Sequence, residues 1–548
     1  MATDLDADQI CREQEQLASQ RSNFDNLWQR VVHRVLPNSD QFTELTMEGQ
    51  SKTQRLFTSL PVTANSRFAA FIHEGMTPRD QIWHGLAPED DALKDNQSVS
   101  RYLDRVSKAL FAQRYRPLAN FTSQRHDCYL SAGAIGNYCL FVDEDIGFGA
   151  RYKSLYIAQV WWSENHQGII DCVYYKFEMT GRNVMARAKD NGWEIPARMA
   201  KVCAEKPFDN HTFIFAVRPN TNRTNSYSHD GMPWSSYYVA VEDKVCVSKG
   251  GFRTFPFAIG RIDKAPNEIW SRSPAMNVFG SILTLNEQKK TVLRAGQLVT
   301  EPPSLLTEEG ILGNFSMAPG AMNYGGLNSQ GEPMIKSYET KGRVDIGVDL
   351  MGIEERDIND GFMVSLFQIL ADHPQMTATE VLNRMQERAQ LLSPMTARLE
   401  SEDLGPMILR ELDILSRDSA HRWIIDEMPE ELIEAGGNFK IVYESPLAKS
   451  RRASEALAIT RSLEVGTVAA GLDPNAMLVM DVPEAYRTVC EINGVPADIM
   501  RSKEDVAALL AERERQQQMM AIAQLAPGVA GAARDVAQAE QIRQTAAA

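Results

Sequence analysis

The sequence predicts an α+β protein that is mostly helical. Most of its 548 residues show the spacing of apolar side chains that is typical of amphipathic helices. Between residues 136 and 260 this spacing gives way to short runs rich in aromatic and β-branched residues, which predict strands. Farther along, two long helical segments enclose residues 301–340, which are rich in Gly, Pro, Asn and Ser. A chain of this length corresponds to about three or four domain-sized units.

The first part of the chain is expected to be helical. In the first segment Leu17, Phe24 and Trp28 lie on one apolar stripe, and Pro37 ends the helix because proline lacks a backbone donor. The same periodicity recurs three more times. Helices are expected at residues 10–36, 59–75, 98–113 and 118–134.

The strand-rich part follows and is interrupted once by a helical segment at residues 180–204. Turn signals such as Pro219-Asn220 and Gly250-Gly251 separate its runs. We therefore expect a mixed α+β region. Its strands are expected at Tyr138–Val142, Leu155–Trp162, Ile169–Phe177, His211–Val217, Ser236–Val241, Lys244–Ser248 and Phe252–Ile259.

Two long helices come next. Ser273 and Pro274 predict the start of the first, because serine caps free backbone donors and proline fits the first helical position. This helix should run to about Val299. The second is expected over about 344–370, although three glycines within it disfavour a helix. The enclosed residues 301–340 should form a small β or loop module.

The last part opens with a polar, proline-containing loop and a pair of helices. Thr377 and Glu380 have the spacing of a capping box, and Pro394 lies near the start of the second helix. A strand at 438–444 should follow, then helices at about 450–464, 483–491 and 503–525, and a low-complexity tail. The apolar face of the second helix of the pair is Met395, Leu399, Leu404, Ile408, Leu412 and Leu415.

Composition restricts the classes of function. The 57 basic and 72 acidic residues give a formal charge of −15, which disfavours broad DNA binding, because that needs Lys and Arg to displace counterions. It does not disfavour a protein that lets DNA slide past. The seven cysteines form no CxxC pair, which fits a reducing compartment. The acidic start is no signal peptide and no long apolar run predicts a membrane span, so we expect a cytoplasmic protein without a membrane partner.

The sequence holds no recognisable catalytic motif. We find no phosphate-binding GxxxxGK loop, no HExxH and no GxSxG, and the nine histidines do not cluster with cysteine at metal-ligand spacing. Acidic clusters such as Glu354-Glu355 and Asp143-Glu144-Asp145 could serve a metal-dependent nuclease, but such carboxylates are mostly ordinary surface charge. We therefore expect neither an enzyme nor a bound cofactor or metal.

Acidic residues gather in the second long helix. Asp345 and Asp349 are four residues apart, so a helix places them on one face. An ordinary solvated face explains this equally well. Alternatively, copies of this helix line a pore whose negative wall repels DNA phosphates. From Arg343 to Asp372 only Arg343 and Arg356 oppose the seven acids Asp345, Asp349, Glu354, Glu355, Asp357, Asp360 and Asp372.

The loop after this helix is the candidate constriction of such a pore. Proline limits its flexibility, and its glutamine and methionine offer soft contacts rather than base reading. A plain connection between two helices is the alternative. The candidate residues are Asp372, His373, Pro374, Gln375 and Met376.

Several segments over about residues 10–465 are distinctive: SLPVTANSRFAAFIHEGMTP, NFTSQRHDCYLSAGAIGNYCLFV, GGFRTFPFAIGRIDKAPNEIWSRSPAM, TEPPSLL and MTATEV. They resemble the portal, or head-to-tail connector, proteins of short-tailed double-stranded DNA bacteriophages. The chain departs from the family pattern at Arg261-Ile262, where Arg-Trp is expected, and at residues 270–274, where Trp-Ser-Arg-Ser-Pro replaces Tyr-Gly-Arg-Gly-Pro. Both departures leave the helix start at Ser273 intact.

The resemblance implies a portal fold: a mixed α/β wing, a two-helix stem, a small β or loop clip and a C-terminal helical crown. On this chain it implies the first part of the wing at residues 1–270, stem helices at 271–300 and 341–371, the clip at 301–340, a channel loop at 372–376, the second part of the wing at 377–500, and the crown helix and flexible tail at 501–548.

The resemblance also implies a function. Copies of the chain, expected to number twelve, would form a ring at one capsid vertex of the virion after assembly in the host cytoplasm. The ring would contact the terminase motor, tail adaptor proteins, and major capsid and scaffolding proteins, and would pass double-stranded DNA during packaging and ejection. Two alternatives remain at this point: a metal-dependent DNA-processing enzyme, and a non-portal internal scaffold of the virion.

Overall fold

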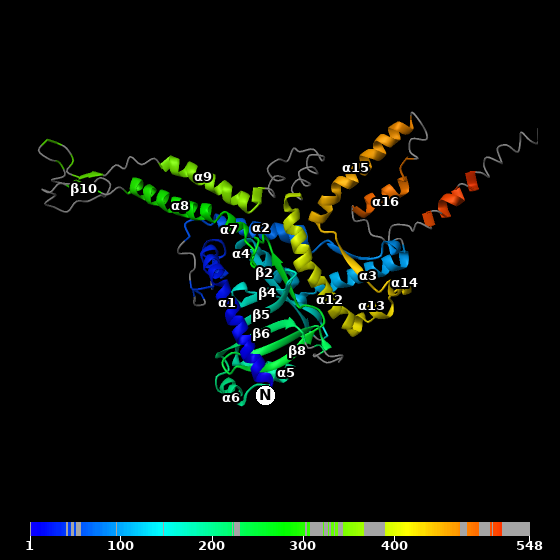
Figure 1. The fold of residues 1–548 in the computed structure, drawn as a ribbon. Coiled ribbons are helices and arrows are strands. Elements are labelled where there is room, and N and C mark those ends of the chain that lie inside the picture. Colours follow the sequence, from blue (N-terminus) through cyan, green and yellow to red (C-terminus); the bar gives the residue numbers. More distant parts are fainter. Residues whose placement is uncertain are drawn as a thin grey trace, which may run out of the picture. The chain divides into compact units, whose positions relative to one another are not determined.

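The protein forms two compact units, which we describe separately. Unit 1 comprises residues 1–83, 110–422 and 445–451, and unit 2 comprises residues 84–109, 423–444 and 452–548. A computed structural model, shown in Figure 1, describes residues 2–39, 42–44, 49–50, 56–94, 96–145, 147–221, 223, 231–301, 304–306, 322, 327, 330–331, 333, 335–337, 344–365, 390–471, 479–492, 505–506, 508–513 and 515–517.

A five-stranded antiparallel sheet forms the centre of unit 1. Its strands follow one another in chain order, each paired with the next. Successive side chains of a strand point to opposite faces, and on the middle strand Phe213 and Ile214 are both buried, so both faces of the sheet are covered. The strands are β4 (Val160–Glu164), β5 (Ile170–Thr180), β6 (Asn210–Pro219), β7 (Trp234–Ala240) and β8 (Val245–Phe252).

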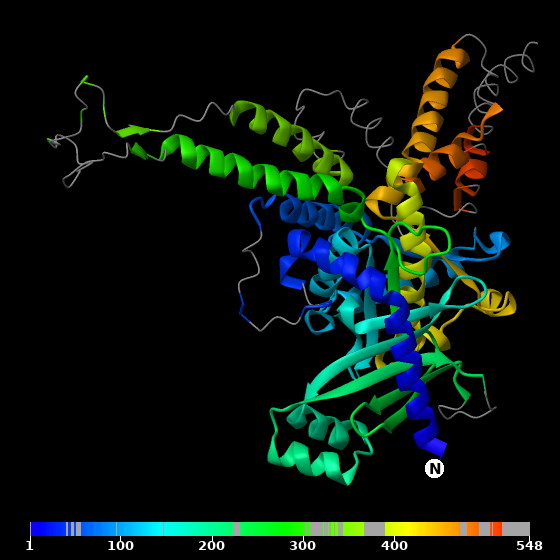
Figure 2. The same ribbon diagram turned by 60° about the vertical axis from the view of Figure 1, so that its left-hand side comes forward.

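Helices cover the two faces of this sheet. The long helix α1 (Ala2–Val35) crosses one face, where Ile10 packs with Trp161 and Ile214 (Figure 2). Helices α5 (Gly181–Asn191) and α6 (Ala197–Glu205) cover the other, where Trp193 packs with Phe213. Amphipathic helices thus bury their apolar stripes against a sheet that has no polar face.

A second, three-stranded sheet has the order β3-β2-β9 and packs against helix α4. Helices α2 and α4 lie close together because Gly133 has no side chain; a Cβ there would collide with Asn65 and Phe68. Gly136 ends α4 in the left-handed region, with φ of 84°. The elements are α2 (Leu60–Met76), α4 (Phe121–Ile135), β2 (Asn137–Asp145), β3 (Gly149–Leu155) and β9 (Phe257–Arg261).

Two other helices of unit 1 run side by side, α8 (Phe279–Thr300) and α9 (Val344–Gly361). The short strands β10 and β11 pair antiparallel between them in sequence. Later, residues 390–399 are helical and continue through a π-helical turn into α12. The bounds are α7 (Pro274–Asn277), β10 (Ser304–Leu306), β11 (Ile335–Ser337), the π-helical turn η6 (Glu400–Leu404) and α12 (Gly405–Arg417).

Unit 2 contains a two-stranded antiparallel sheet of β1 and β12 and several helices. Within it Tyr102 packs edge-on against Trp423. In the part of the chain that the structure describes, no helix is both long and apolar enough to cross a membrane. The elements are β1 (His84–Pro88), most of α3 (Gln97–Arg114), α13 (Trp423–Asp426), α14 (Glu430–Glu434), β12 (Phe439–Tyr443), most of α15 (Pro446–Ala470) and α16 (Val482–Ile492).

The mixed, mostly helical fold class is confirmed, but several local expectations are wrong. The strand expected at 252–259 is the end of β8 and the start of β9, with residues 253–256 between them. The strand expected at 155–162 is two strands separated by the short 3-10 helix Ile157–Gln159. The helix expected at 180–204 is two helices. The second long helix ends at Gly361 rather than near 370, because Met363 takes a left-handed φ of 58° that no helix continues through. The capping box at 377–380 lies outside the described residues.

Candidate functional site

The helix start predicted at Ser273 and Pro274 fixes one end of the α8–α9 pair. We call this end, where Val278 lies against Gly361, the base of the pair. The Ser273 hydroxyl accepts a hydrogen bond from the Met276 N–H at 3.0 Å and donates one to the Ala134 carbonyl at 2.9 Å. It therefore caps α7 and ties this corner to the end of α4. Val278 interrupts the expected single helix, so α7 and α8 meet at a short break.

Helices α8 and α9 run antiparallel in close contact, as Figures 1 and 2 both show. Two glycines of α9 permit this. A Cβ at Gly361 would collide with Val278, and one at Gly347 would lie 2.7 Å from the Val292 methyl group. Gly361 therefore marks the base of the pair, and Gly347 a point farther along it. Two of the three glycines that disfavoured a helix in the sequence thus permit close packing, whereas a Cβ at Gly352 would meet no atom within 4 Å.

Helix α9 exposes the two acidic residues that the sequence singled out. Asp345 and Asp349 are both exposed, while Met351 and Ile358 are buried. Helix α9 carries six acidic residues against Arg356 alone, so its surface is strongly negative. The other predicted site residues, Asp372, His373, Pro374, Gln375 and Met376, lie outside the described residues.

An apolar stripe on α9 also faces solvent in the single subunit. Ile346, Leu350 and Ile353 are 46%, 46% and 53% exposed, and their spacing of four and three residues places them on one side of the helix. Helix α8 adds Leu293 and Leu298, which are 48% and 44% exposed. Clustered exposed aliphatic side chains of this kind mark surfaces that another molecule covers.

Buried ion pairs hold the helical segment that begins at residue 390. Residues 366–389, which precede it, lie outside the described part of the chain. Arg125 and Asp403 are fully buried, and the guanidinium donates to both carboxylate oxygens, with one N–O distance of 2.9 Å. Tyr138 donates to the same carboxylate at 2.7 Å. Burial and the Asp403 charge raise the pKa of Tyr138 well above its usual value, so it remains a donor.

Two further arginines bind neighbouring positions of this helical segment. Arg114 donates from Nε to Glu411 of α12 at 3.1 Å, and both side chains are buried. Arg261 donates to Glu402 at 2.7 Å and 2.8 Å. The π-helical turn η6 thus presents two adjacent carboxylates, on Glu402 and Asp403, to arginines on different strands or helices. Sequence reasoning missed all of these pairs.

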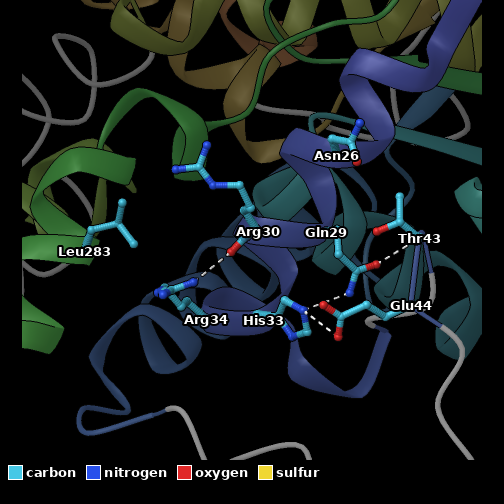
Figure 3. A pocket seen from close by; sticks show the side chains of 8 residues that line it. All are labelled: Asn26, Gln29, Arg30, His33, Arg34, Thr43, Glu44 and Leu283. Atoms are coloured by element: carbon cyan, nitrogen blue, oxygen red, sulfur yellow. Dashed lines mark hydrogen bonds and ion pairs between the residues drawn. The ribbon is translucent and has the colours of Figure 1, made fainter.

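A polar pocket of about 400 Å³ opens between the second half of α1 and the base of α8. Figure 3 shows Arg30 and Arg34 extending from α1 toward the side where Leu283 of α8 lies. On the other side His33 lies 3.5 Å from the Glu44 carboxylate. The lining residues are Asn26, Gln29, Arg30, His33, Arg34, Thr43, Glu44 and Leu283.

Two of the three carboxylates of the acidic cluster at 143–145, considered for a nuclease, are bound to arginines. Glu144 accepts from Arg417 at 2.7 Å, and Asp145 accepts from Arg151 at 3.2 Å. Among the described residues, no group of three or more His, Cys, Asp or Glu is placed to hold a metal ion. Burial raises the pKa of Cys128 to about 12, so this thiol remains protonated rather than nucleophilic.

Comparison with known proteins gives a consistent result. A family model described as "Bacteriophage head to tail connecting protein" matches residues 7–500. The chain is 24% identical over 523 residues to the "Probable portal protein" of Bordetella phage BPP-1, covering 92% of this chain and 90% of that protein. It is 21% identical over 530 residues to the "Portal protein" of Salmonella phage epsilon15, covering 94% and 92%. A solved structure titled "Neck of empty GTA particle computed with C6 symmetry" has 12% identity and a TM-score of 0.36, over 84% of this chain and 98% of that chain.

Proposed function

The chain belongs to the family of bacteriophage head-to-tail connecting proteins, and from that premise we propose that it is a portal subunit that works as a ring of identical copies. The ring occupies one vertex of the capsid in the virion. Double-stranded DNA passes through its centre during packaging and ejection. The subunit is a structural component of the particle rather than an enzyme, and no cofactor is needed for this role.

The exposed stripe of Ile346, Leu350 and Ile353 is the observation that carries the ring proposal. A closed ring of head-to-tail contacts covers one surface of every subunit with a different surface of the next. The α8–α9 pair supplies such surfaces on two helices. Copies of the pair, twelve by the family resemblance, then form a bundle around the axis, in which aliphatic side chains pack between subunits.

The acidic residues of α9 suit the same arrangement. Beside the apolar stripe, Asp345 and Asp349 form a negative ridge. In the ring we place this ridge toward the channel, where like charge repels DNA phosphates and leaves few fixed contacts to break at each step. We place the loop of residues 372–376 at the narrowest point.

The parts of the chain then take the following roles. The sheets and helices of residues 1–270 and 377–500 form the wing, α8 and α9 form the stem, and residues 301–340 form the clip. The clip contacts the terminase motor during packaging and tail adaptor proteins afterwards. Scaffolding and major capsid proteins contact the wing, and residues 501–548 form the crown. Assembly takes place in the host cytoplasm.

Particle imaging and mass measurement of the purified protein test the ring. We expect closed rings with a central channel, and we expect Ile353→Asp to raise the protein concentration needed for assembly about tenfold or more, because burial of an isoleucine is worth about 1.5–3 kcal/mol. Ile169→Asp, at a side chain 59% exposed in the β4–β5 turn, is the matched control. A wild-type protein that remains monomeric under all conditions contradicts the proposal.

A second experiment tests the loop. Replacing Gln375 and Met376 with alanine should leave rings intact but impair DNA packaging or retention, measured as the amount of nuclease-protected DNA per assembled particle. Normal packaging by that variant would remove the loop from the channel.

A further inference from the structure

The pocket beside α1 has the charge and position of a receptor for an acidic side chain. Arg30 lies on the exposed side of α1, and Arg34 one turn later extends to the same side (Figure 3). Leu283 of α8 forms the opposite edge. The pocket therefore holds two guanidinium groups beside an aliphatic side chain, at the base of the α8–α9 pair; Arg34 also donates to the Arg30 carbonyl at 3.3 Å, and Arg30 lies over the Phe279 ring.

The exposed stripe of α9 changes from aliphatic to acidic residues toward the base of the α8–α9 pair. Ile346, Leu350 and Ile353 continue at the same spacing of four and three residues into Asp357 and Asp360, which are both exposed. One side of a single helix is thus aliphatic along its first part and acidic along its last turns. A surface that covers this side needs an aliphatic region followed by a basic one.

The pocket and the acidic end of the stripe lie at the same level along the pair. Val278, just before α8, lies against Gly361, and Val292 of α8 lies against Gly347. Leu283 falls between the two valines, so in the antiparallel pair it lies level with the part of α9 around Asp357. Rotation about a ring axis does not change the position of a residue along that axis. In a stem whose α8–α9 pairs run along the ring axis, surfaces at the same level along the pair therefore face each other in adjacent subunits.

We propose that Asp357 and Asp360 of one subunit enter the pocket of the next subunit and pair there with Arg30 and Arg34. This inference rests on the proposed ring and assigns residues to one of its contacts. The aliphatic part of the stripe supplies most of the attraction between neighbouring stems. The acidic end fixes their register, because charge complementarity selects one alignment over others.

A nucleic acid is a poorer occupant of this pocket. Tight contact with DNA usually involves a row of basic residues along the backbone. Here the two arginines lie on one short stretch of α1.

The experiment exchanges charges between subunits. Arg30→Glu and Asp357→Arg, each alone, should raise the concentration at which rings form about tenfold or more, since each places like charges together. The double variant should assemble like wild type. An equimolar mixture of the two single variants should also recover rings, because each subunit supplies the surface that matches the altered surface of the other. Only a contact between subunits produces that recovery.

Arg12→Glu is the matched control, since it makes the same charge change at an exposed position of α1 far from the pocket. Circular dichroism establishes that each single variant is folded. Assembly is read by mass measurement at a series of protein concentrations and at two salt concentrations, and wild-type ring formation should weaken at the higher one.

The possible results separate the inference from the proposal on which it rests. If wild type never forms rings, the proposed function fails and this contact with it. If wild type forms rings and Arg30→Glu behaves like Arg12→Glu, or if the mixture does not recover, the contact is wrong although the ring remains. If Arg30→Glu assembles normally but loses binding of a fluorescent DNA duplex, the pocket binds DNA instead.

Discussion

The Arg125–Asp403 pair allows a quantitative test of what holds η6 in place. Asp403→Asn keeps the shape of the side chain but removes its charge, and the amide NH₂ then faces guanidinium N–H groups. Because Arg125 is fully buried, it loses its anion without gaining water. Breaking a buried pair in this way costs about 3–5 kcal/mol, which is roughly a 10²- to 10⁴-fold change in the unfolding equilibrium.

Equilibrium urea unfolding followed by tryptophan fluorescence measures this cost. The control is Asp145→Asn, which breaks a pair with Arg151 in the same unit, where the side chains are 41% and 57% exposed. Exposed pairs contribute about 0–1 kcal/mol, so the control should lie close to wild type. The double variant Arg125→Met/Asp403→Leu replaces both members of the pair with apolar residues. It should be clearly more stable than Asp403→Asn, because it leaves no buried charge without a partner.

The reasoning is refuted if Asp403→Asn destabilises the protein no more than Asp145→Asn. It is also refuted if the double apolar variant is as unstable as Asp403→Asn, since the cost would then come from packing rather than from an unpaired charge.

Two further predictions concern helix packing and pH. Gly361→Ala should destabilise the protein by about 1–3 kcal/mol, because its methyl group would collide with Val278, whereas Gly352→Ala, with no atom within 4 Å, should stabilise it by up to about 1 kcal/mol; thermal unfolding compares them. Burial, Arg125 and His126 lower the pKa of His73 from 6.5 to about 4. The unfolded chain then binds the proton first, so stability should fall as the pH drops from about 6.5 to about 4, and His73→Gln should flatten this dependence in urea unfolding at a series of pH values. A dependence as steep in that variant as in wild type would assign the effect to other groups.

Features that depend on neighbouring residues in sequence could be predicted. Ser273 and Pro274 mark a helix start by local chemistry alone, and the structure confirms the cap. The four-residue spacing of Asp345 and Asp349 likewise placed both on one exposed face of α9. Such features require no knowledge of the rest of the fold, because the backbone geometry of a helix fixes them.

Features that depend on residues far apart in the sequence could not be predicted. Arg125 and Asp403 are separated by 278 positions, and nothing near either residue indicates the other. The end of the second long helix was misplaced because Met363 adopts a conformation that methionine rarely takes, which tertiary contacts rather than local preference must impose. The exposure of the stripe on α9 could not be predicted, because the sequence does not tell which apolar residues of a helix are covered by other parts of the fold.

The π-helical turn η6 has a consequence for how this chain tolerates change. Residues 390–399 and α12 form one rod whose two ends are out of phase by the extra residue of that turn. Deleting a single residue there would restore an ordinary helix, and because the wide turn holds about one residue more than an α-helical turn, residues 390–399 would keep their orientation relative to α12. A residue deleted elsewhere in this rod has no wide turn to absorb the change and would rotate one part against the other by about 100°, so a change of length is tolerated best at η6.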